Sequence, residues 1–468
     1  MTTIDVVARL AYLGAATCFV LGLHLMNSPA TARRGNRLSA GGMLLAVAAT
    51  AGLLADSTAA TPTALWVLAA GVAVGAAAGL YGARRAPTTS MPQLVSIFNA
   101  AGGGAAALIG LHEVLRATAG SLPVRVATPA ALDIVIGAVT LSGSLIASGK
   151  LHGVITGRPL VFPGVRAVNA GLGLAIAAAG GYVATGHTGL PVVLVLSVAA
   201  LAFGVTMVLP IGGADMPVVI SLLNAFTGTA VAMAGFVIGN TGLIIAGALV
   251  GASGTILTKL MADAMNRSIM NIVVGGFGAA DSDGSVVAAK ASVRELSVDD
   301  AAIQLAYASR VVIVPGYGLA AAQAQHSVNE LATMLQSRGV DVTYAIHPVA
   351  GRMPGHMNVL LAEANVPYDQ MRDMDEANPD FARTDVVLVV GANDIVNPAA
   401  RRAGTAISGM PILDVDRATS VIVIKRSMGY GYAGIDNELY TDPKTGMLFS
   451  DAKVGLTALT SAVKTLVG

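Results

Sequence analysis

Long apolar stretches recur along the first part of the chain, and each is close to the ~20 residues that a helix needs to cross the hydrocarbon layer of a bilayer. They lie at residues 4–26, 39–55, 65–83, 93–115, 132–149, 165–185, 190–211, 218–239 and 242–262. The first is too long for a signal-peptide core and has no basic start, so we expect it to be the first span. The pattern predicts about nine transmembrane helices, with the two ends of the chain on opposite sides of the membrane.

Basic residues gather at one set of span ends. That side collects Arg33, Arg34, Arg37, Arg84, Arg85, Lys150, Arg158, Arg166, Lys259 and Arg267, whereas the other side has Arg116 and Arg125. Because cytoplasmic loops carry the excess of Lys and Arg, the C-terminal part of the chain is expected in the cytoplasm and the N-terminus outside. The sequence therefore predicts a multi-pass protein of the inner cell membrane.

An internal repeat relates two of the spans. Residues 91–110 and 216–235 both open with Met-Pro and then place Asn, Gly and Gly at identical offsets. These matched residues are Asn99, Gly103 and Gly110 in the first stretch and Asn224, Gly228 and Gly235 in the second. The spans that follow match within a residue or two, and both units run in the same direction, which indicates a parallel duplication.

After the last span, short strands alternate with helices. We expect strands at 311–314, 341–346, 386–390 and 421–425, and helices at 319–337, 356–364 and 451–466. This alternation is typical of a doubly wound parallel sheet, that is, of a Rossmann-like α/β domain. The predicted organisation is a multi-pass α-helical membrane bundle at 1–268, a Gly- and Ser-rich linker at 269–294 and the α/β domain at 295–468.

Composition narrows the classes of function. Charged residues make up 12% of the chain and the formal net charge is +1, so the clustered cations that nucleic-acid binding needs are missing. The one cysteine, Cys18, lies in an apolar stretch, which leaves neither a disulfide framework nor a thiolate metal site. The 55 glycines favour helices that pack closely through small residues. We therefore expect no nucleic-acid partner and no metal.

A glycine turn follows the first predicted strand of the α/β domain and opens a helix. It reads Gly316-Tyr317-Gly318-Leu319-Ala320-Ala321, a dinucleotide-binding pattern with alanine in the place of the third glycine. Bare backbone at such a turn lets a pyrophosphate approach the helix N-terminus. The same residues are also compatible with a tight strand-to-helix turn that binds no ligand.

The end of the second strand distinguishes NADP from NAD. NAD sites usually carry an acidic residue there, whereas this chain has none between His347 and Arg352. A missing carboxylate and a nearby arginine favour NADP, whose 2′-phosphate an acid would repel. Lys425, Arg426 and Ser427, at the end of another strand, are a second candidate for the phosphate site, although basic strand ends also occur as solvated rims.

Two further segments lie where such sheets bind ligands. Gly391-Ala392-Asn393-Asp394 ends a strand at the carboxyl edge, where Asp394 is expected either to orient an amide or ribose hydroxyl or to cap the next helix. Residues 429–440 are too rich in glycine and tyrosine for a packed element. We interpret them as a lid over the cofactor, with an ordinary surface loop as the alternative.

Polar residues in and beside the spans are candidates for a proton path or for coupling. Asn99 and Asn224 each lie eight residues beyond a Met-Pro start, which is ~12 Å along a helix and inside the hydrocarbon layer. They fit either a shared polar path or simple hydrogen bonds between helices. The further candidates are His112, Asp215, Ser253 and Arg267.

Five stretches are the most specific parts of the sequence. They are IGGADMPVVISLLN at 211–224, PGYGLAAAQAQ at 315–325, HPVAGRMPGHMNVLLAEA at 347–364, GANDIVNPAA at 391–400 and KRSMGYGYAG at 425–434. Together they closely resemble the beta subunit of proton-translocating NAD(P) transhydrogenase, and the resemblance runs through nearly the whole chain.

The resemblance implies a membrane domain joined to an NADP(H)-binding domain, and a separate alpha subunit that carries NAD(H), in a dimer of alpha–beta units. Hydride would pass directly from NADH to NADP⁺, driven by protons that move inward. No side chain of this chain would then be a nucleophile or general base, because the cofactors carry the chemistry.

The resemblance also implies a set of cofactor contacts. Lys425, Arg426 and Ser427 would hold the 2′-phosphate, rather than Arg352, and the loop through Tyr432 would be the lid. The other expected contacts are Gly316, Tyr317, Gly318, Val349, Ala350, Gly351, Arg352, Met353, Pro354, Gly391, Ala392, Asn393, Asp394, Ile395, Gly409, Met410, Met428, Gly429, Tyr430, Gly431, Asp451 and Ala452.

Two positions depart from the family pattern. Some relatives have a histidine where this chain has Asn99 and a lysine where it has Asp263. Asparagine does not exchange a proton near neutral pH, so the titrating group is expected elsewhere, at His112, at Asp215 or on the alpha subunit.

Two other classes of function compete with hydride transfer. One is an ion channel or carrier gated by a cytoplasmic nucleotide-sensing domain, and the spans contain no TVGYG-type selectivity filter that would support it. The other is a soluble dehydrogenase with a passive anchor, for which a single helix would be enough.

Overall fold

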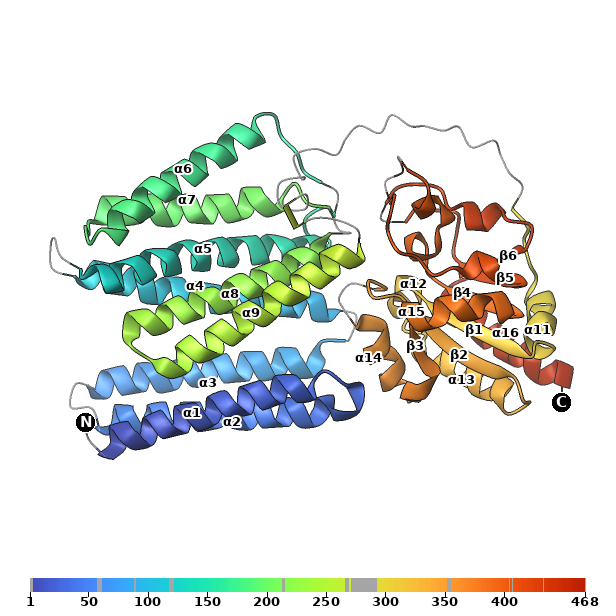
Figure 1. The fold of residues 1–468 in the computed structure, drawn as a ribbon, viewed down its shortest axis with the longest axis horizontal. Helices are drawn as coiled ribbons and strands as arrows, with labels where there is room; N and C mark the ends of the chain where they lie inside the picture. The colour runs from blue at the N-terminus through green and yellow to red at the C-terminus, as the bar shows by residue number, and fades with distance from the viewer. Residues whose placement is uncertain are drawn as a thin grey trace. The chain divides into compact units, whose positions relative to one another are not determined.

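The computed structural model describes residues 3–56, 61–87, 90–117, 122–157, 159–212, 215–265, 269–270, 293–351, 355–403, 405, 407–431 and 433–467. The chain divides into two compact units, Met1–Thr258 and Lys259–Gly468 (Figure 1), and each is described by itself. Most of the predicted linker at 269–294 lies outside the described residues. The predicted three-part division therefore stays a prediction.

Among the described residues, nine helices are long and apolar enough to cross a membrane, which confirms the predicted multi-pass bundle. They are α1 (Thr3–Leu25), α2 (Pro29–Asp56), α3 (Pro62–Arg85), α4 (Met91–Arg116), α5 (Val124–His152), α6 (Val165–Ala184), α7 (Leu190–Val208), α8 (Met216–Ile238) and α9 (Thr241–Ala264). Helix α5 packs against α4, α6, α7 and α8 and is the most buried of them, whereas none of the apolar part of α3 is buried.

Two helices begin about two turns or more before their apolar stretches. Helix α2 begins at Pro29 rather than at residue 39, and Arg33, Arg34 and Arg37 lie exposed on its first turns. Helix α5 begins at Val124 rather than at residue 132. Hydropathy identifies only the part of a helix that lies in the hydrocarbon layer, whereas the backbone hydrogen bonds of the helix continue beyond that part. Long basic side chains at such a helix end reach the aqueous interface.

The two copies of the predicted repeat make the same kind of helix contact. A Cβ added at Gly103 or Gly110 of α4 would lie 2.8 Å from Thr140 Cβ or Ala130 O of α5. A Cβ added at Gly228 or Gly235 of α8 would lie 2.8 or 2.7 Å from backbone atoms of α9. Helices this close exclude a side chain at the contact, so the repeated glycines hold two matching helix pairs together.

We predict that Gly228→Ala destabilises the membrane unit, because the added Cβ meets the backbone of α9 and one helix must move. Overpacking of this kind costs about 1–3 kcal/mol. The matched control is Gly79→Ala in α3, where nothing lies within 4 Å of the added Cβ. Thermal unfolding of both variants in detergent checks the prediction. Equal midpoints for the two variants would contradict it.

Among the described residues of the C-terminal unit, six strands form a parallel sheet. They are β1 (Arg310–Pro315), β2 (Asp341–Ile346), β3 (Met371–Asp373), β4 (Val386–Val390), β5 (Ser420–Lys425) and β6 (Thr445–Phe449). Their order is β3-β2-β1-β4-β5-β6, with every neighbouring pair parallel. This is the doubly wound order of Rossmann-like folds and confirms the predicted fold class.

Helical elements precede, connect and follow these strands. The α-helices are α11 (Val298–Ala306), α12 (Tyr317–Ala321), α13 (Gln325–Gln336), α14 (His356–Glu363), α15 (Met374–Ala377) and α16 (Ala452–Val467). The 3₁₀ turns are η2 (Tyr368–Gln370), η3 (Asn378–Arg383), η4 (Asp394–Val396), η5 (Pro398–Arg401), η6 (Val415–Arg417) and η7 (Glu438–Thr441).

The prediction of a single helix at 319–337 is wrong. Helices α12 and α13 are separate, because the chain turns at Gln323, whose φ of 51° lies in the left-handed region. The amide of Ala324 donates to the carbonyl of Leu319 at 3.1 Å and closes α12. Helix ends of this type usually carry glycine, so a run of Ala and Gln gave no signal. The short strands β3 and β6 and the helix α11 were not predicted.

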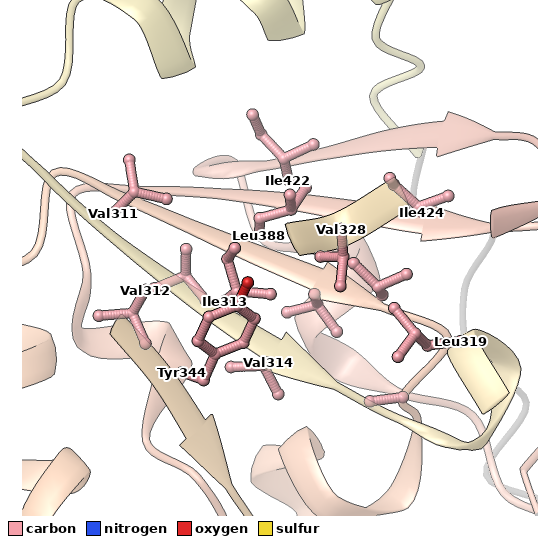
Figure 2. Close-up of a cluster of buried hydrophobic side chains, with 14 of the residues drawn as sticks. Val311, Val312, Ile313, Val314, Leu319, Val328, Tyr344, Leu388, Ile422 and Ile424 are labelled. Carbon is pink, nitrogen blue, oxygen red and sulfur yellow. The ribbon is translucent and has the colours of Figure 1, made fainter. Parts of the chain in front are cut away.

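The centre of the sheet is buried on both faces. Val311, Ile313 and Val314 of β1 have no exposed surface, and β4 is buried along its whole length. Figure 2 shows side chains of β1, β2, β4 and β5 packed together with Leu319 and Val328 from the helices. This core fixes the carboxyl ends of the strands, from which the candidate site is built.

Candidate functional site

A cavity of about 500 Å³ lies at the carboxyl edge of the sheet. Its lining comes from the segments that follow β1, β2, β4, β5 and β6. The order of strands reverses between the neighbours β1 and β4, and doubly wound sheets bind ligands outside the carboxyl ends at such a switch point. The cavity therefore lies where the fold class leads one to expect a ligand.

Most of the predicted cofactor contacts line this cavity. They are Gly316, Tyr317, Gly318, Val349, Ala350, Gly351, Gly391, Ala392, Asn393, Asp394, Ile395, Lys425, Arg426, Ser427, Gly429, Tyr430, Gly431 and Ala452. Ala321, Ile424 and Ser450 also line it and were not predicted. Their side chains are small or apolar, so the residue types alone did not indicate a binding role. Their positions next to a motif or a strand end could have indicated it.

Other predicted contacts lie elsewhere. Among the described residues, Gly409, Met410, Met428 and Asp451 are outside the lining. Met410 packs against the small apolar cluster around Ile407, and Met428 is exposed. Arg352, Met353, Pro354 and Tyr432 lie outside the described residues.

The glycines of the two turns at the switch point meet each other. Gly318 donates its N–H to the carbonyl of Gly391 at 2.9 Å, and a Cβ added to Gly318 would lie 2.6 Å from Gly391 Cα. Gly391 has a φ of 65°, a conformation that favours glycine. The bare backbone of the Gly316-Tyr317-Gly318 turn therefore joins the segment after β4 and does more than leave room for a pyrophosphate.

Lys425 is the last residue of β5 and brings a positive charge to the cavity wall. Its Nζ donates to the carbonyl of Gly429 and lies 4.7 Å from the centroid of the Tyr440 ring. Burial lowers the pKa of this amine, and the nearby charge of Asp394 opposes that shift. The ammonium is held by a carbonyl and an aromatic face, a partly desolvated arrangement that strengthens its attraction to an anion.

Arg426 follows Lys425 and pairs with an acid. Its Nη2 lies 2.9 Å from Asp451 Oδ2, with 67% of the arginine side chain exposed. Asp451 also accepts the amide N–H of Lys453 at 3.0 Å and stands immediately before α16. Asp451 therefore caps α16 and orients Arg426, a role that the sequence did not reveal.

The segment after Arg426 is tied to the segment after β4. Ala433 donates its N–H to Asp394 Oδ2 at 3.1 Å, and Asn437 Nδ2 donates to the carbonyl of Asn393 at 3.0 Å. The Tyr440 hydroxyl donates to the carbonyl of Ala392 at 2.9 Å. Asp394 thus binds the expected lid segment through its side chain, and its contact with an amide or ribose hydroxyl of a ligand stays a prediction.

His347 fixes the turn after β2. It is 1% exposed, its Nδ1 accepts the N–H of Val349 at 3.2 Å, and its Nε2 lies 2.8 Å from the carbonyl of Pro411. This pattern requires the neutral ring with its proton on Nε2. Burial lowers the pKa of His347 to about 4, with the bond to Pro411 opposing the shift.

Comparison with known proteins identifies the family. The family model described as NAD(P) transhydrogenase beta subunit matches residues 8–462. The NAD(P) transhydrogenase subunit beta of Rhodospirillum rubrum is 48% identical over 457 residues, which cover 95% of this chain and 96% of the relative. The protein of the same name from one strain of that organism matches with the same values.

The chain belongs to the NAD(P) transhydrogenase beta subunit family.

Membership confirms the resemblance carried by the five specific stretches and agrees with nine apolar helices followed by a parallel-sheet domain. The chain is a membrane-bound transhydrogenase subunit, and its designation as beta implies an alpha-subunit partner. The predicted roles of single residues are not part of these matches and stay predictions.

The membrane unit of this family member places the coupling candidates in different surroundings. Asn99 is buried, and its Nδ2 donates to the carbonyl of Ile220 in α8 at 3.3 Å, whereas Asn224 is half-buried. Asp215 is half-buried at the N-cap of α8. His112 is exposed, and Ser253 is half-buried. Arg267 lies outside the described residues.

We predict that His347 makes the C-terminal unit less stable in acid. Its pKa is lower in the folded state, about 4, than the usual 6.5, so its stabilising effect is present above pH 6.5 and is lost as the pH falls toward 4. The full loss corresponds to about 3 kcal/mol.

Hydrogen-exchange protection of the β2 amides in the full chain, corrected for intrinsic rates, measures this loss. The His347→Gln variant should be less stable at neutral pH but should show a weaker fall in protection between pH 6.5 and 4. A parallel fall in parent and variant would assign the acid sensitivity to other groups.

Proposed function

We propose that this beta subunit binds NADP(H) in the cavity at the carboxyl edge of its sheet. An alpha subunit brings NAD(H) to it, and hydride transfer from NADH to NADP⁺ is coupled to inward proton movement through the membrane unit. One transhydrogenase chain contains both a membrane unit, with nine apolar helices among its described residues, and a domain with this cavity, and that combination is the observation that carries the proposal.

The cavity suits a phosphorylated dinucleotide in size and in charge. Its volume of about 500 Å³ lies within the range of small-molecule sites, ~300–1,000 Å³. Lys425, Arg426 and Ser427 add two cations and a hydroxyl to the lining, and the turns after β1 and β4 add glycine backbone to it. No acidic side chain follows β2, where NAD sites usually carry one.

The residues of this chain bind and orient, and the cofactors supply the hydride chemistry. Lys425 and Arg426 hold the 2′-phosphate, for which Arg426 exchanges its pairing with Asp451 for the phosphate oxygens. The turn at Val349, Ala350 and Gly351, held by His347, supports the dinucleotide from the β2 side. The segment tied down by Asp394 covers the cofactor and excludes water.

The proposal also covers the orientation of the chain in the membrane and the assembly of the complex. The basic span ends face the cytoplasm, so the N-terminus lies outside and the C-terminal unit lies in the cytoplasm. Two alpha–beta units form the working complex.

Membranes that contain both subunits test the proposal. Reduction of an NADP analogue by NADH is expected to accelerate when a proton gradient of inward direction is imposed, and to return to the basal rate when an uncoupler is added. A rate that does not respond to the gradient would exclude proton-coupled hydride transfer. Nucleotide-dependent ion flux without hydride transfer would support a gated channel instead.

For the 2′-phosphate, Lys425→Ala should weaken binding of NADP much more than binding of NAD, because only NADP loses a charge-assisted bond. Such a bond contributes about 1.5–3 kcal/mol, or roughly 10- to 100-fold in Kd. Lys464→Ala is the control, since that exposed lysine pairs with Glu330 on α13 and not with cavity residues. Calorimetric titration measures both. Equal losses for NADP and NAD would place the phosphate elsewhere.

A further inference from the structure

An acidic residue is buried inside the membrane unit without a neighbouring positive charge, among the described residues, that would stabilise its negative charge. Asp133 stands in α5, nine residues from the first residue of the helix, and is 0% exposed. Within the described part of the chain, neither carboxyl oxygen of Asp133 has a hydrogen-bond partner. Its carboxyl packs against Gly110 of α4, where an added Cβ would lie 3.2 Å from Asp133 Oδ2. The missing side chain of Gly110 makes the room for it.

The neighbours of Asp133 are apolar. Val114 of α4, Ala130 and Ile134 of α5 and Val237 of α8 belong to one buried cluster beside it. An ionised carboxylate in such surroundings, with no partner, costs several kcal/mol, and a carboxyl in that position takes up a proton instead. Asp133 therefore carries its proton in this conformation.

Titratable groups on the helices around α5 are few and lie near the helix ends. On α4, Glu113 is half-buried one turn beyond Gly110, and His112 and Arg116 are exposed. Helices α7 and α8 contain no titratable side chain, and α6 contains Arg166 and Tyr182 close to its two ends. On α5 itself, the others are Arg125, Lys150 and His152, near its two ends. None supplies a counter-charge at the level of Asp133.

A line of hydroxyl groups continues from Asp133 along the same face of α5. Thr140, Ser144 and Ser148 follow at steps of seven, four and four residues, which keeps them on one side of a helix. The Ser144 hydroxyl is buried and, among the described residues, has no partner. The carbonyl of Ser144 accepts the hydroxyl of Ser96 from α4 at 2.8 Å. The contact between α4 and α5 is thus polar from Asp133 toward the opposite helix end, and it passes the level of Asn99.

We infer that Asp133 is a proton-binding site of the membrane unit and supplies the exchangeable proton that Asn99 cannot supply. The inference rests on the proposed proton-coupled function. In one step, a hydronium ion on the side of His112 and Glu113 passes a proton to the ionised Asp133 carboxylate, so that an O–H bond of the donor breaks, water is left behind and the carboxyl O–H bond forms. In the next, that bond breaks and the proton passes to water or a hydroxyl on the α4–α5 face. No redox change or other reactant is involved.

Membranes containing the complete alpha–beta complex test this inference. Asp133→Asn keeps the size and neutral charge of the protonated side chain but cannot exchange a proton, so gradient-stimulated hydride transfer should fall about 100-fold. Asp133→Glu, which can still titrate, should keep most of the stimulation. Asp263→Asn, an acid-to-amide change at an exposed position of α9, is the control and should behave like the parent.

Two readouts separate this inference from a purely structural role. NADP(H) affinity should be unchanged in Asp133→Asn, and infrared difference spectra recorded with and without the gradient should lose a protonated-carboxyl C=O band that the parent shows. Parent-like stimulation in Asp133→Asn would overturn the inference while leaving the proposed function intact. The absence of that band from the parent would also overturn it, even if the Asn variant failed to fold. No gradient response in the parent would overturn the proposed function itself.

Discussion

The close approach of two backbones at glycine is the constraint on which both units depend. In the membrane unit, Gly103 and Gly228 lie so close to the neighbouring helix that a single added carbon would clash. In the C-terminal unit, Gly318 and Gly391 meet where β1 and β4 end, and this contact sets the geometry of the cavity. With little aromatic side-chain volume available, packing of this kind is how the chain gains van der Waals contact.

Close packing also determines what a buried polar group can do. Lys150 is 5% exposed, yet its Nζ donates to the carbonyls of Leu209 and Ile211, so it fixes the end of α7 against α5. Asp133 is also buried, and in the described part of the chain neither of its carboxyl oxygens has a hydrogen-bond partner. A buried cation that donates hydrogen bonds to carbonyl groups can stay charged and stabilise the contact between helices. A buried carboxyl group without a hydrogen-bond donor is more stable in its protonated, neutral form.

The candidate site combines rigid and releasable parts. The turns after β1 and β4 are fixed by contacts between glycines, and the turn after β2 is fixed by the hydrogen bond between His347 and Val349. These turns follow strands whose side chains belong to the buried core. The segment beyond Arg426 is held by a few hydrogen bonds to Asp394 and Asn393, and Arg426 itself by one exposed ion pair. A site of this design can keep the geometry of its turns while the segment after Arg426 and the side chain of Arg426 change partners.

The sequence by itself determined the spans, the parallel α/β domain and the order of the motif-bearing turns. Apolar length, strand-and-helix alternation and specific local patterns such as that at 315–325 are properties of neighbouring residues. It did not determine the break at Gln323, the short strands β3 and β6, or the pairing of Arg426 with Asp451. Asp133 is an acid inside a predicted span, so the sequence does contain a signal for it, but its burial and lack of a partner are properties of the folded chain. The tertiary structure decided these points because burial, close contact and the presence or absence of a partner depend on residues far apart in the chain.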